Sequence, residues 1–507
     1  MADRKPVFAL MTPYGTENNG VRMLAAVLKE RGYETHTVFF KSWRNNDVIA
    51  PTRLEVEQLC GHLKAVGPDV VGIGFGTPYL RLVAQVSRAI REATGAKIVA
   101  GGIHPTFASG DCVGWADGTA IGEGEPIIAD IAERTKAGES WDGIPGLRLP
   151  HHETAPAAPD FVDLNTLPHR DFSHDNKVLI EGGKIIPGDP LLRQGQIRVH
   201  ASRGCPYACS YCYEASLENV YGKRFRFRRR SVDSVLEEVK AARRTFGRFK
   251  RVKFDDDTFI FPMRWMEEFC ERWPQEVGLP FDILLNPEAY KRDHIEMLVA
   301  AGLKHVQMGV EAASAEEAEM YDRKDSAAVV KEFGELAARH NLEVNYDVIL
   351  DNPMASTKDR RAMVDLLTEL PRPYRVFLYS LNAFPESGVF DSLRDQGHMT
   401  ERELEGRAQK TFRQFRASFD WPRPAEDRAH IALCALASKP FIPASFVRAA
   451  SRSHLLTRHP GLLTGLARFT DVIRLYSIGL EKLIKGELTW VKIREYGGFS
   501  FRRVLTQ

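Results

Sequence analysis

Three cysteines, Cys205, Cys209 and Cys212, lie in one short stretch of the chain. The residues before them, 197–202, alternate apolar and polar side chains and predict a strand, so we expect the thiols on a tight loop at its end. An iron–sulfur cubane normally takes four cysteine ligands. Three ligands without a nearby fourth would leave one iron free to bind another molecule. A structural zinc site needs four closed ligands, and the remaining cysteines are far away in sequence. The stretch therefore predicts an iron–sulfur site.

This spacing, with Tyr211 just before the last cysteine, resembles the signature of the radical S-adenosylmethionine (SAM) superfamily. The resemblance implies that Cys205, Cys209 and Cys212 ligate a [4Fe-4S] cluster whose free iron holds the amino and carboxylate groups of SAM. It also implies an external electron donor such as flavodoxin or ferredoxin. One electron would then cleave SAM to a 5'-deoxyadenosyl radical. The sequence assigns no catalytic acid, base or nucleophile.

Further motifs stand where the superfamily contacts SAM. Asp255, Asp256 and Asp257 end the predicted second strand of a barrel, and the resemblance makes Asp256 and Asp257 candidates for the SAM amino group. Glu311 matches an acidic residue after strand four. Arg323 or Lys324 follows where a basic residue meets the SAM carboxylate, and Lys324 is our candidate. Judged alone, an acidic strand end also fits a helix N-terminus or a magnesium site, and a lone glutamate is most often solvated.

Residues 1–150 alternate short apolar runs with helical patterns, which predicts βαβ units and a parallel sheet. We expect a doubly wound, flavodoxin-like α/β domain, in which ligands bind beyond the carboxyl ends of the strands. Four glycine-rich loops should meet at that edge, and glycine lets the backbone approach a large flat ligand closely. The candidate cofactor contacts in these loops are Gly74, Thr77, Gly101, Gly102, His104, Gly122, Glu123 and Gly124.

The arrangement resembles the cobalamin-binding domain found ahead of many radical SAM barrels. The loops that carry the resemblance are Gly-Gly-x-His-Pro at residues 101–105 and Gly-Glu-Gly-Glu at residues 122–125. The Asp-x-His-x-x-Gly motif, whose histidine ligates cobalt in other cobalamin-binding proteins, is missing from this sequence. A loop histidine such as His104 is more often a hydrogen-bonding residue than a metal ligand. We therefore expect bound cobalamin without a histidine on cobalt.

The rest of the chain divides into three parts. Residues 151–195 are rich in proline and polar side chains and predict a linker, in which His151 and His152 are expected to be solvated. Residues 196–395 show six βα units and predict a partial (β/α)6 radical SAM barrel, with its chemistry at the carboxyl ends of the strands. Residues 396–507 predict a helical C-terminal domain that packs on the barrel and closes the substrate site.

Composition restricts the partners. The chain has 69 basic and 67 acidic residues, and this balance argues against nucleic-acid binding. The basic run at 223–230 is interpreted as a solvated face or a contact to a substrate anion. Cysteine usage and the lack of an apolar run of about 18 residues predict a cytoplasmic protein without a transmembrane segment. Residues 446–507 hold 11 Lys/Arg and 4 Asp/Glu beside an amphipathic pattern, which also fits peripheral membrane contact or a lipid-like or anionic small-molecule substrate.

These features favour a cobalamin-dependent radical SAM methyltransferase acting on an unactivated carbon, or on a phosphinate phosphorus, through a 5'-deoxyadenosyl radical and methylcobalamin. The resemblance also admits a cyclase or a ring-rearranging enzyme of tetrapyrrole, lipid or natural-product biosynthesis. A third hypothesis, from another class, is a non-catalytic corrinoid or tetrapyrrole carrier. The joint presence of the cysteine loop, the acidic strand end and Glu311 argues against a mere carrier.

Overall fold

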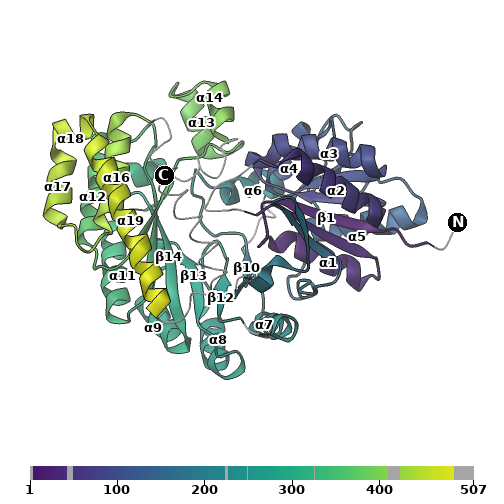
Figure 1. Ribbon diagram of the computed structural model, residues 1–507, viewed down its shortest axis with the longest axis horizontal. Coiled ribbons are helices and arrows are strands. Elements are labelled where there is room, and N and C mark those ends of the chain that lie inside the picture. Colours follow the sequence, from purple (N-terminus) through teal and green to yellow (C-terminus); the bar gives the residue numbers. More distant parts are fainter. Residues whose placement is uncertain are drawn as a thin grey trace.

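The computed structural model describes residues 4–42, 50–193, 195–222, 227–247, 249–324, 326–408 and 423–484. Two sheets form two domains, and a group of helices lies at the far end of the second domain from the first (Figure 1). Helix α6 (Tyr213–Tyr221) lies between the two sheets (Figure 1). The chain thus passes from an N-terminal α/β domain through a second α/β domain to C-terminal helices.

The N-terminal sheet has eight strands in the order β6-β5-β4-β3-β1-β2-β7-β8. The six central strands are parallel, and the edge strands β6 and β8 are antiparallel to their neighbours. The strands are β1 (Phe8–Pro13), β2 (Thr35–Phe40), β3 (Val70–Gly74), β4 (Lys97–Gly101), β5 (Gly118–Ala120), β6 (Leu147–Arg148), β7 (Lys177–Glu181) and β8 (Lys184–Pro187).

Helices cover both faces of this sheet. One face packs against α1 (Asn19–Glu30) and α5 (Gly124–Ala137), and the other against α2 (Arg53–Val66) and α3 (Leu80–Thr94). The short helix α4 (Ile103–Phe107) follows β4 at the carboxyl edge. The central strands are buried on both sides, which explains their nearly continuous apolar sequences. The predicted doubly wound α/β fold is confirmed.

The stretch from 151 to 195, whose composition predicts a linker, supplies β7 and β8 to the N-terminal sheet. Strand β7 pairs in parallel with β2, and Gly182-Gly183 forms the turn to β8 with positive φ at both glycines. Ionic contacts hold the remainder of the stretch: Asp189 accepts from Arg22 at 2.7 Å and from Lys177 at 3.0 Å. The stretch is therefore built into the first domain rather than extended between domains.

The second sheet has six strands in sequential order, β9-β12-β13-β14-β15-β16, all parallel. Helices connect successive strands, so the sheet is the predicted partial (β/α)6 barrel. Its strands are β9 (Gln196–Val199), β12 (Arg251–Phe254), β13 (Phe281–Leu285), β14 (Leu303–Glu311), β15 (Glu343–Ile349) and β16 (Arg375–Tyr379). Its helices are α7 (Val232–Phe246), α8 (Met263–Glu276), α9 (Arg292–Ala301), α10 (Ala315–Met320), α11 (Ala327–Arg339) and α12 (Thr357–Glu369).

The C-terminal helices pack on the outside of the barrel. They are α16 (Ala425–Ala437), α17 (Ala444–Arg452), α18 (His454–Arg458) and α19 (Gly461–Ile484). Helix α16 contacts α12 and the edge strand β16, and α19 packs on α16. The segment nearer the barrel mouth is instead α13 (Gly388–Asp395) with α14 (Glu401–Ala408) (Figure 1). Among the described residues, α16–α19 lie beside the barrel and α14 lies nearer its mouth, so closure of the substrate site by residues 396–507 stays a prediction.

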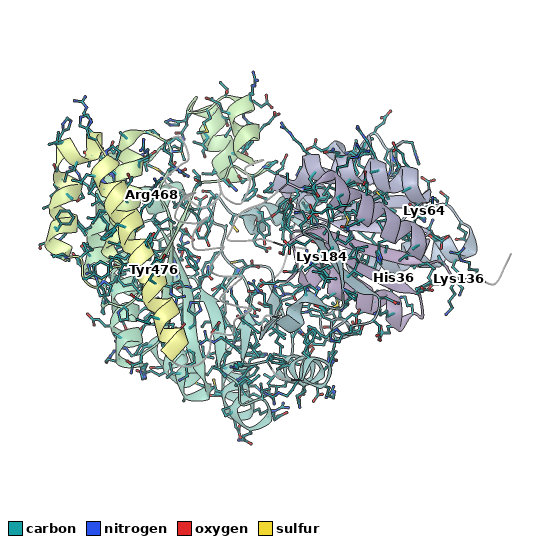
Figure 2. All side chains as sticks on the ribbon, in the orientation of Figure 1. His36, Lys64, Lys136, Lys184, Arg468 and Tyr476 are labelled. Atoms are coloured by element: carbon teal, nitrogen blue, oxygen red, sulfur yellow. The ribbon has the colours of Figure 1, made fainter. Side chains whose placement is uncertain are left out.

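One face of α19 carries apolar side chains in contact with solvent. Leu462, Phe469, Ile473, Tyr476 and Leu480 are 39–71% exposed and recur at intervals of seven, four, three and four residues. Figure 2 shows Tyr476 and Arg468 on this helix, at the end of the molecule opposite the N-terminal domain. Among the residues described, no helix combines the length and apolar character that crossing a bilayer requires.

Candidate functional site

The three cysteines lie on a loop at residues 204–212, called here the cysteine loop, between the short strand β10 (Ser202–Arg203) and helix α6 (Tyr213–Tyr221). Gly204 begins the loop with φ 83°, in the left-handed region that favours glycine. Ser210 anchors its middle, because its N–H donates to the Tyr321 carbonyl at 3.1 Å and its hydroxyl donates to the Met320 carbonyl at 2.9 Å. The structure therefore brings the predicted cluster ligands together on one fixed turn.

The chemistry of this thiol set fits an iron cluster. All seven cysteines of the chain are described, and each is a free thiol. Burial raises the pKa of Cys205 to about 12 and raises the pKa of Cys209 and Cys212. Thiolates are the form that ligates metal, so a positively charged group must supply the missing stabilisation. A cluster with three cysteine ligands would provide that charge at this loop.

Glu311 and Arg323 lie beside the cysteine loop. Glu311 ends β14 with φ 62°, a strained conformation for a residue with a side chain, and the pairing of β14 with β15 is irregular there. Arg323 donates to the Tyr211 hydroxyl at 2.8 Å and to the Gly309 carbonyl at 2.6 Å. Burial raises the pKa of Glu311 to about 7, although the charge of Arg323 opposes that rise. A carboxylate and a guanidinium side by side can receive an ammonium and a carboxylate of one ligand.

Lys324 differs from Arg323 in its surroundings. Its side chain is 84% exposed, and its ammonium lies 3.5 Å from Glu288. The structure thus places Arg323 in contact with Tyr211 and leaves Lys324 at the surface. The sequence could not show which of these two adjacent residues faces the cysteine loop, because a loop has no fixed periodicity that assigns its side chains to a face.

The three aspartates after β12 occupy different environments. Asp256 is buried, and its carboxylate accepts from the Ala201 N–H at 3.2 Å and from the Ser202 hydroxyl, so it fixes the chain just before the cysteine loop. Asp255 pairs with Arg198 at 3.0 Å. Asp257 is exposed. Burial, together with the charge of Asp257, raises the pKa of Glu214, in the first turn of α6, to about 8. Of the two candidates, Asp257 presents the more accessible carboxylate.

The N-terminal candidates gather at the carboxyl edge of the first sheet. Gly74 pairs with Gly101 at the ends of β3 and β4. His104 is 2% exposed, with Nδ1 3.2 Å from the Thr77 hydroxyl and Nε2 3.3 Å from Asp111. Burial lowers the pKa of His104. Nδ1 thus has the Thr77 hydroxyl as a partner, whereas Nε2 forms no hydrogen bond to a described residue and lies only within ion-pair distance of Asp111, so cobalt without a histidine ligand stays a prediction.

Protein contacts also explain some of the glycines. Gly102 has φ 103°, and a Cβ there would lie 2.8 Å from the Phe75 carbonyl oxygen. Gly122 has φ 85°, and a Cβ there would lie 2.2 Å from the hydroxyl of Tyr221. Gly124 begins α5, where its neighbour is Leu24. These protein contacts do not test whether the glycines also contact a corrinoid. That contact stays a prediction for Gly74, Gly101, Gly102, Gly122 and Gly124.

Glu123 contacts the second domain. Its carboxylate accepts from Arg203 at 3.0 Å and from Arg228. Sequence reasoning missed Arg203 and Arg228 as its partners, because no local pattern predicts a contact across about 80 residues or more. In the described part of the basic run, Arg228 pairs with Glu123 and Arg230 is buried against Glu238, so these two do not belong to a solvated face, whereas Arg229 is exposed. Residues 223–226 lie outside the described part.

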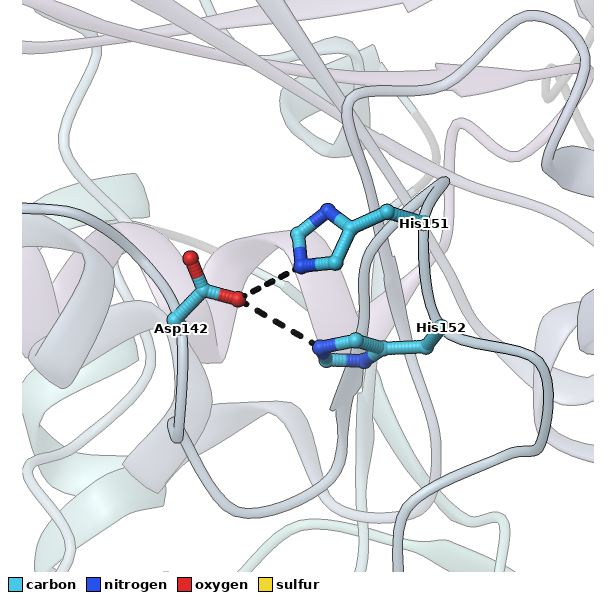
Figure 3. Close-up of side chains that lie close together, drawn as sticks. All are labelled: Asp142, His151 and His152. Carbon is cyan, nitrogen blue, oxygen red and sulfur yellow. Dashed lines mark hydrogen bonds and ion pairs between the residues drawn. The ribbon is translucent and has the colours of Figure 1, made fainter.

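A separate cluster at the surface of the first domain joins Asp142, His151 and His152 (Figure 3). The Asp142 carboxylate lies 2.7 Å from Nε2 of His151 and 3.4 Å from Nε2 of His152. Nδ1 of His152 accepts the Leu149 N–H at 3.2 Å, so in the neutral ring Nε2 carries the proton and points it at Asp142. A metal would need that nitrogen's lone pair. Asp142, His151 and His152 therefore form a hydrogen-bonded group rather than a metal site.

Comparison with known proteins matches both domains. Residues 199–367 match the radical SAM superfamily, and residues 7–132 match the B12-binding domain. An anaerobic magnesium-protoporphyrin IX monomethyl ester cyclase of Cereibacter sphaeroides is 24% identical over 363 residues, which are 67% of this chain and 55% of the cyclase. The chain thus spans little more than half of that relative.

A bacteriochlorophyllide d C-12(1)-methyltransferase of Chlorobaculum tepidum is 24% identical over 344 residues, covering 65% of this chain and 67% of the enzyme. Among solved structures, the radical SAM methyltransferase TsrM of Kitasatospora setae, with cobalamin and a [4Fe-4S] cluster bound, has a TM-score of 0.62 at 15% identity. The match covers 92% of this chain and 100% of that one. The likeness to TsrM shows that the order and fold of the domains are shared.

Proposed function

We propose that this chain, which joins a B12-binding domain to a radical SAM domain, is a cobalamin-dependent radical SAM methyltransferase. Its acceptor would be an unactivated carbon, or a phosphinate phosphorus, of a small-molecule substrate. The observation that carries the proposal is the cysteine loop: three free thiols fixed beside the half-buried Glu311 carboxylate and Arg323 guanidinium at the carboxyl ends of parallel strands. Active sites of parallel barrels lie at that end.

When bound, the [4Fe-4S] cluster and cobalamin supply reductive cleavage of SAM and carriage of the methyl group. The protein's part is to bind and to orient. Cys205, Cys209 and Cys212 hold the iron. Glu311 accepts from the amino group of SAM, and Arg323, held by Tyr211, faces its carboxylate. The glycine-rich carboxyl edge of the first sheet takes the corrinoid, and His104 stays on its protein partners rather than on cobalt.

The relatives support methyl transfer and name one alternative. The similarity to a methyltransferase extends over 65% of this chain. The similarity to the magnesium-protoporphyrin ester cyclase extends over 67%, so cyclisation or ring rearrangement of a tetrapyrrole, lipid or natural product is the second candidate. A non-catalytic corrinoid or tetrapyrrole carrier would have no use for Glu311 and Arg323 beside a thiol loop. Those two residues favour an enzyme over a carrier.

An external reductant such as flavodoxin or ferredoxin would deliver the electron at the outer side of the cysteine loop. A surface cavity of about 450 Å³ lies there, lined by Pro206, Tyr207 and Ala208 of the loop. Glu288, Glu319 and Asp322 line the same cavity, together with Arg323 and Lys324. The cavity brings solvent to the loop that carries the cluster, so a redox partner can approach the loop without entering the barrel.

The exposed apolar face of α19 supports peripheral contact with an anionic membrane, where a lipid-like or anionic substrate would be found. Burying one such side chain contributes about 1.5–3 kcal/mol, and residues 446–507 carry a surplus of basic residues. Co-sedimentation with phosphatidylglycerol vesicles tests this. The triple change Leu462→Ser, Phe469→Ser and Tyr476→Ser should remove binding, whereas Leu54→Ser, at an exposed leucine of α2, should not. Equal sedimentation of wild type and triple variant would exclude α19 as the contact.

The central experiment is anaerobic reconstitution followed by turnover. The wild type should hold about four irons and four sulfides per chain and convert SAM to 5'-deoxyadenosine in the presence of a reductant. Isotopically labelled methyl-SAM, supplied with hydroxocobalamin and cell extract, should place label in a product detected by mass spectrometry. Retention of the cluster after changing all three loop cysteines to alanine would overturn the assignment. Cleavage of SAM without corrinoid binding would exclude methyl transfer through cobalamin.

A further inference from the structure

The loop at residues 122–125 contacts both sides of the cysteine loop. On the upstream side, Arg203 donates to Glu123 at 3.0 Å and to Glu125 at 2.5 Å. On the downstream side, the Glu123 N–H donates to the hydroxyl of Tyr221 at 2.8 Å. Arg203 stands two residues before Cys205, and Tyr221 ends the helix that starts right after Cys212. One loop of the first domain therefore holds both ends of the cluster-binding segment in the second.

The arginines on this contact are held in register. Strand β10 pairs with β11 (Arg228–Arg229) in antiparallel fashion, and Arg203 lies opposite Arg228. Both guanidinium groups reach the same carboxylate of Glu123. Arg228 also donates to the Val162 carbonyl at 2.9 Å and lies over the ring of Phe161, 4.1 Å from its centroid. The pair is thus fixed by backbone pairing as well as by charge.

Burial makes these ion pairs sensitive to the loss of one partner. The side chains of Glu123 and Glu125 are 12% and 8% exposed, and those of Arg203 and Arg228 are 29% and 19% exposed. Breaking a buried pair leaves an uncompensated charge, which is more damaging than removing an exposed pair. Burial opposes ionisation of Glu123, but the two arginines outweigh it and lower its pKa. Glu123 is therefore charged and shared between two cations at neutral pH.

Gly122 allows close contact between the loop at residues 122–125 and the second domain. Its φ of 85° lies in the left-handed region, and a Cβ would stand 2.2 Å from the Tyr221 hydroxyl. Ile121, Ala158 and Tyr221 form a small apolar cluster around this contact. The glycine thus lets the end of α6 approach the backbone of the first domain.

We propose that residues 122–125 act as a latch that positions the cysteine loop against the N-terminal domain, with Glu123 as the central positioning residue. This inference rests on the proposed function in one respect only, namely that the positioned loop carries the cluster. Its consequence is that the loop bordering the predicted corrinoid site also sets the separation between cluster and corrinoid, through its contacts with Arg203, Arg228 and Tyr221. Loosening the latch should therefore disturb the relation between the two cofactors while leaving the iron ligands intact.

The test compares Glu123→Gln with Glu133→Gln in the reconstituted full-length protein. Glu133 lies on α5 in the same domain and bonds Tyr33 at 2.9 Å, so it controls for loss of a carboxylate without touching the latch. Hydrogen exchange of peptides covering residues 204–221 should speed up about tenfold in Glu123→Gln and stay unchanged in Glu133→Gln. Iron content should equal that of the wild type in both. Unchanged exchange in Glu123→Gln would overturn the latch.

A second readout separates positioning from simple stability. With hydroxocobalamin reduced to the cob(II) state, the reduced cluster should enhance its electron spin relaxation, and Glu123→Gln should weaken that enhancement in samples that are fully folded and hold as much iron and corrinoid as the wild type. Gly122→Ala should act in the same direction because its Cβ displaces Tyr221. An unchanged relaxation in both variants would overturn the proposal. Failure of the wild type to take up iron would instead refute the proposed function, while hydrogen exchange would still report on the latch.

Discussion

At the scale of single residues, burial decides which charged groups beside the cysteine loop can act on a ligand. Arg323 and Lys324 are neighbours in sequence, yet Arg323 is fixed by the Tyr211 hydroxyl and the Gly309 carbonyl while Lys324 is 84% exposed. A charge in a low-dielectric site interacts far more strongly than one in water. The guanidinium next to Glu311 is therefore the group able to hold a carboxylate.

These adjacent residues provide a matched pair of variants. Arg323→Gln should weaken SAM binding by the reconstituted protein about tenfold or more, because loss of a charge-assisted hydrogen bond costs about 1.5–3 kcal/mol. Lys324→Gln should change it less than twofold. Equilibrium dialysis with labelled SAM, alongside an iron assay, measures both. Equal effects of the two changes would show that Arg323 does not meet the ligand.

Glu317, buried on α10, predicts a pH dependence of stability. Burial, together with the charge of Asp359, raises its pKa from 4.5 to about 8, although Arg360 opposes the rise. The folded state then binds the proton more tightly than the unfolded state, so this group's contribution to stability is greatest below pH 4.5 and is lost as pH rises toward 8. The slope is at most about 1.4 kcal/mol per pH unit.

Glu317→Gln should remove that slope. Urea unfolding at pH 5, 6.5 and 8 measures the free energy of unfolding, and the difference between wild type and variant isolates the group from other titrations. The variant should gain stability relative to the wild type as pH rises. A difference that stays constant across this range would show that the Glu317 pKa is not raised.

Residue types alone singled out the three cysteines as candidate cluster ligands, because their spacing fits a metal loop wherever it lies in the fold. They did not predict the partners of Glu123 or the burial of Asp256. The local sequence around a carboxylate in a glycine-rich loop does not show whether that carboxylate faces a cofactor or an arginine from another domain. The deciding contact, from Glu123 to Arg203, joins residues 80 positions apart.

At the scale of elements, periodic patterns predicted most helices and strands of both sheets, whereas the two-residue strand β6 and, in the stretch 151–195, the strands β7 and β8 were missed. The sequence of β7 and β8 lies in a stretch rich in proline and glycine whose composition indicates a linker. A hairpin signal was nevertheless present: the β-branched and apolar runs of Lys177–Glu181 and Lys184–Pro187 are separated by two glycines. Local turn chemistry would have found the hairpin, but its pairing with β2 depends on the assembled sheet.

Helix α2 permits two substitutions that should change the free energy of unfolding in opposite directions. Thr52 caps it, since its hydroxyl accepts the Glu55 N–H at 3.2 Å while the Glu55 carboxylate accepts the Thr52 N–H at 2.7 Å. Thr52→Ala should therefore lower the free energy of unfolding by about 1 kcal/mol.

Gly61 lies inside the same helix with open space around it, so Gly61→Ala should raise the free energy of unfolding by up to about 1 kcal/mol. Urea denaturation followed by circular dichroism measures both variants. A loss of stability in Gly61→Ala, or none in Thr52→Ala, would contradict the assigned helix geometry.

At the scale of the whole molecule, ionic contacts join parts that are far apart in sequence. The first domain meets the barrel through Glu123 and also through Arg198, whose guanidinium pairs with Glu17. The barrel meets the C-terminal helices through α12 and α16. The sequence predicted these three parts from their changing periodicity, but the orientation of the last one was not readable. An amphipathic pattern is equally compatible with a helix that covers the active site and with a helix that packs on the side of the barrel.

One buried ion pair joins helix α12 to helix α16. Arg360 on α12 donates to Asp427 on α16 at 2.6 Å, and the two side chains are 11% and 7% exposed. Burial raises the pKa of Asp427 despite this partner, so the carboxylate relies on the arginine to stay charged. Removing one partner of such a pair typically costs about 3–5 kcal/mol, whereas replacing both with apolar side chains is often neutral.

Arg360→Met should therefore destabilise the protein strongly, and the double change Arg360→Met with Asp427→Leu should recover most of the loss. Urea unfolding monitored by circular dichroism supplies the free energies, and tryptophan fluorescence checks that the barrel and the helices still unfold together. A double variant as unstable as the single one would show that the arginine acts through other contacts, such as its 2.6 Å bond to the Ala355 carbonyl. Recovery would establish that the C-terminal helices are held to the barrel by packing, with the ion pair fixing their orientation.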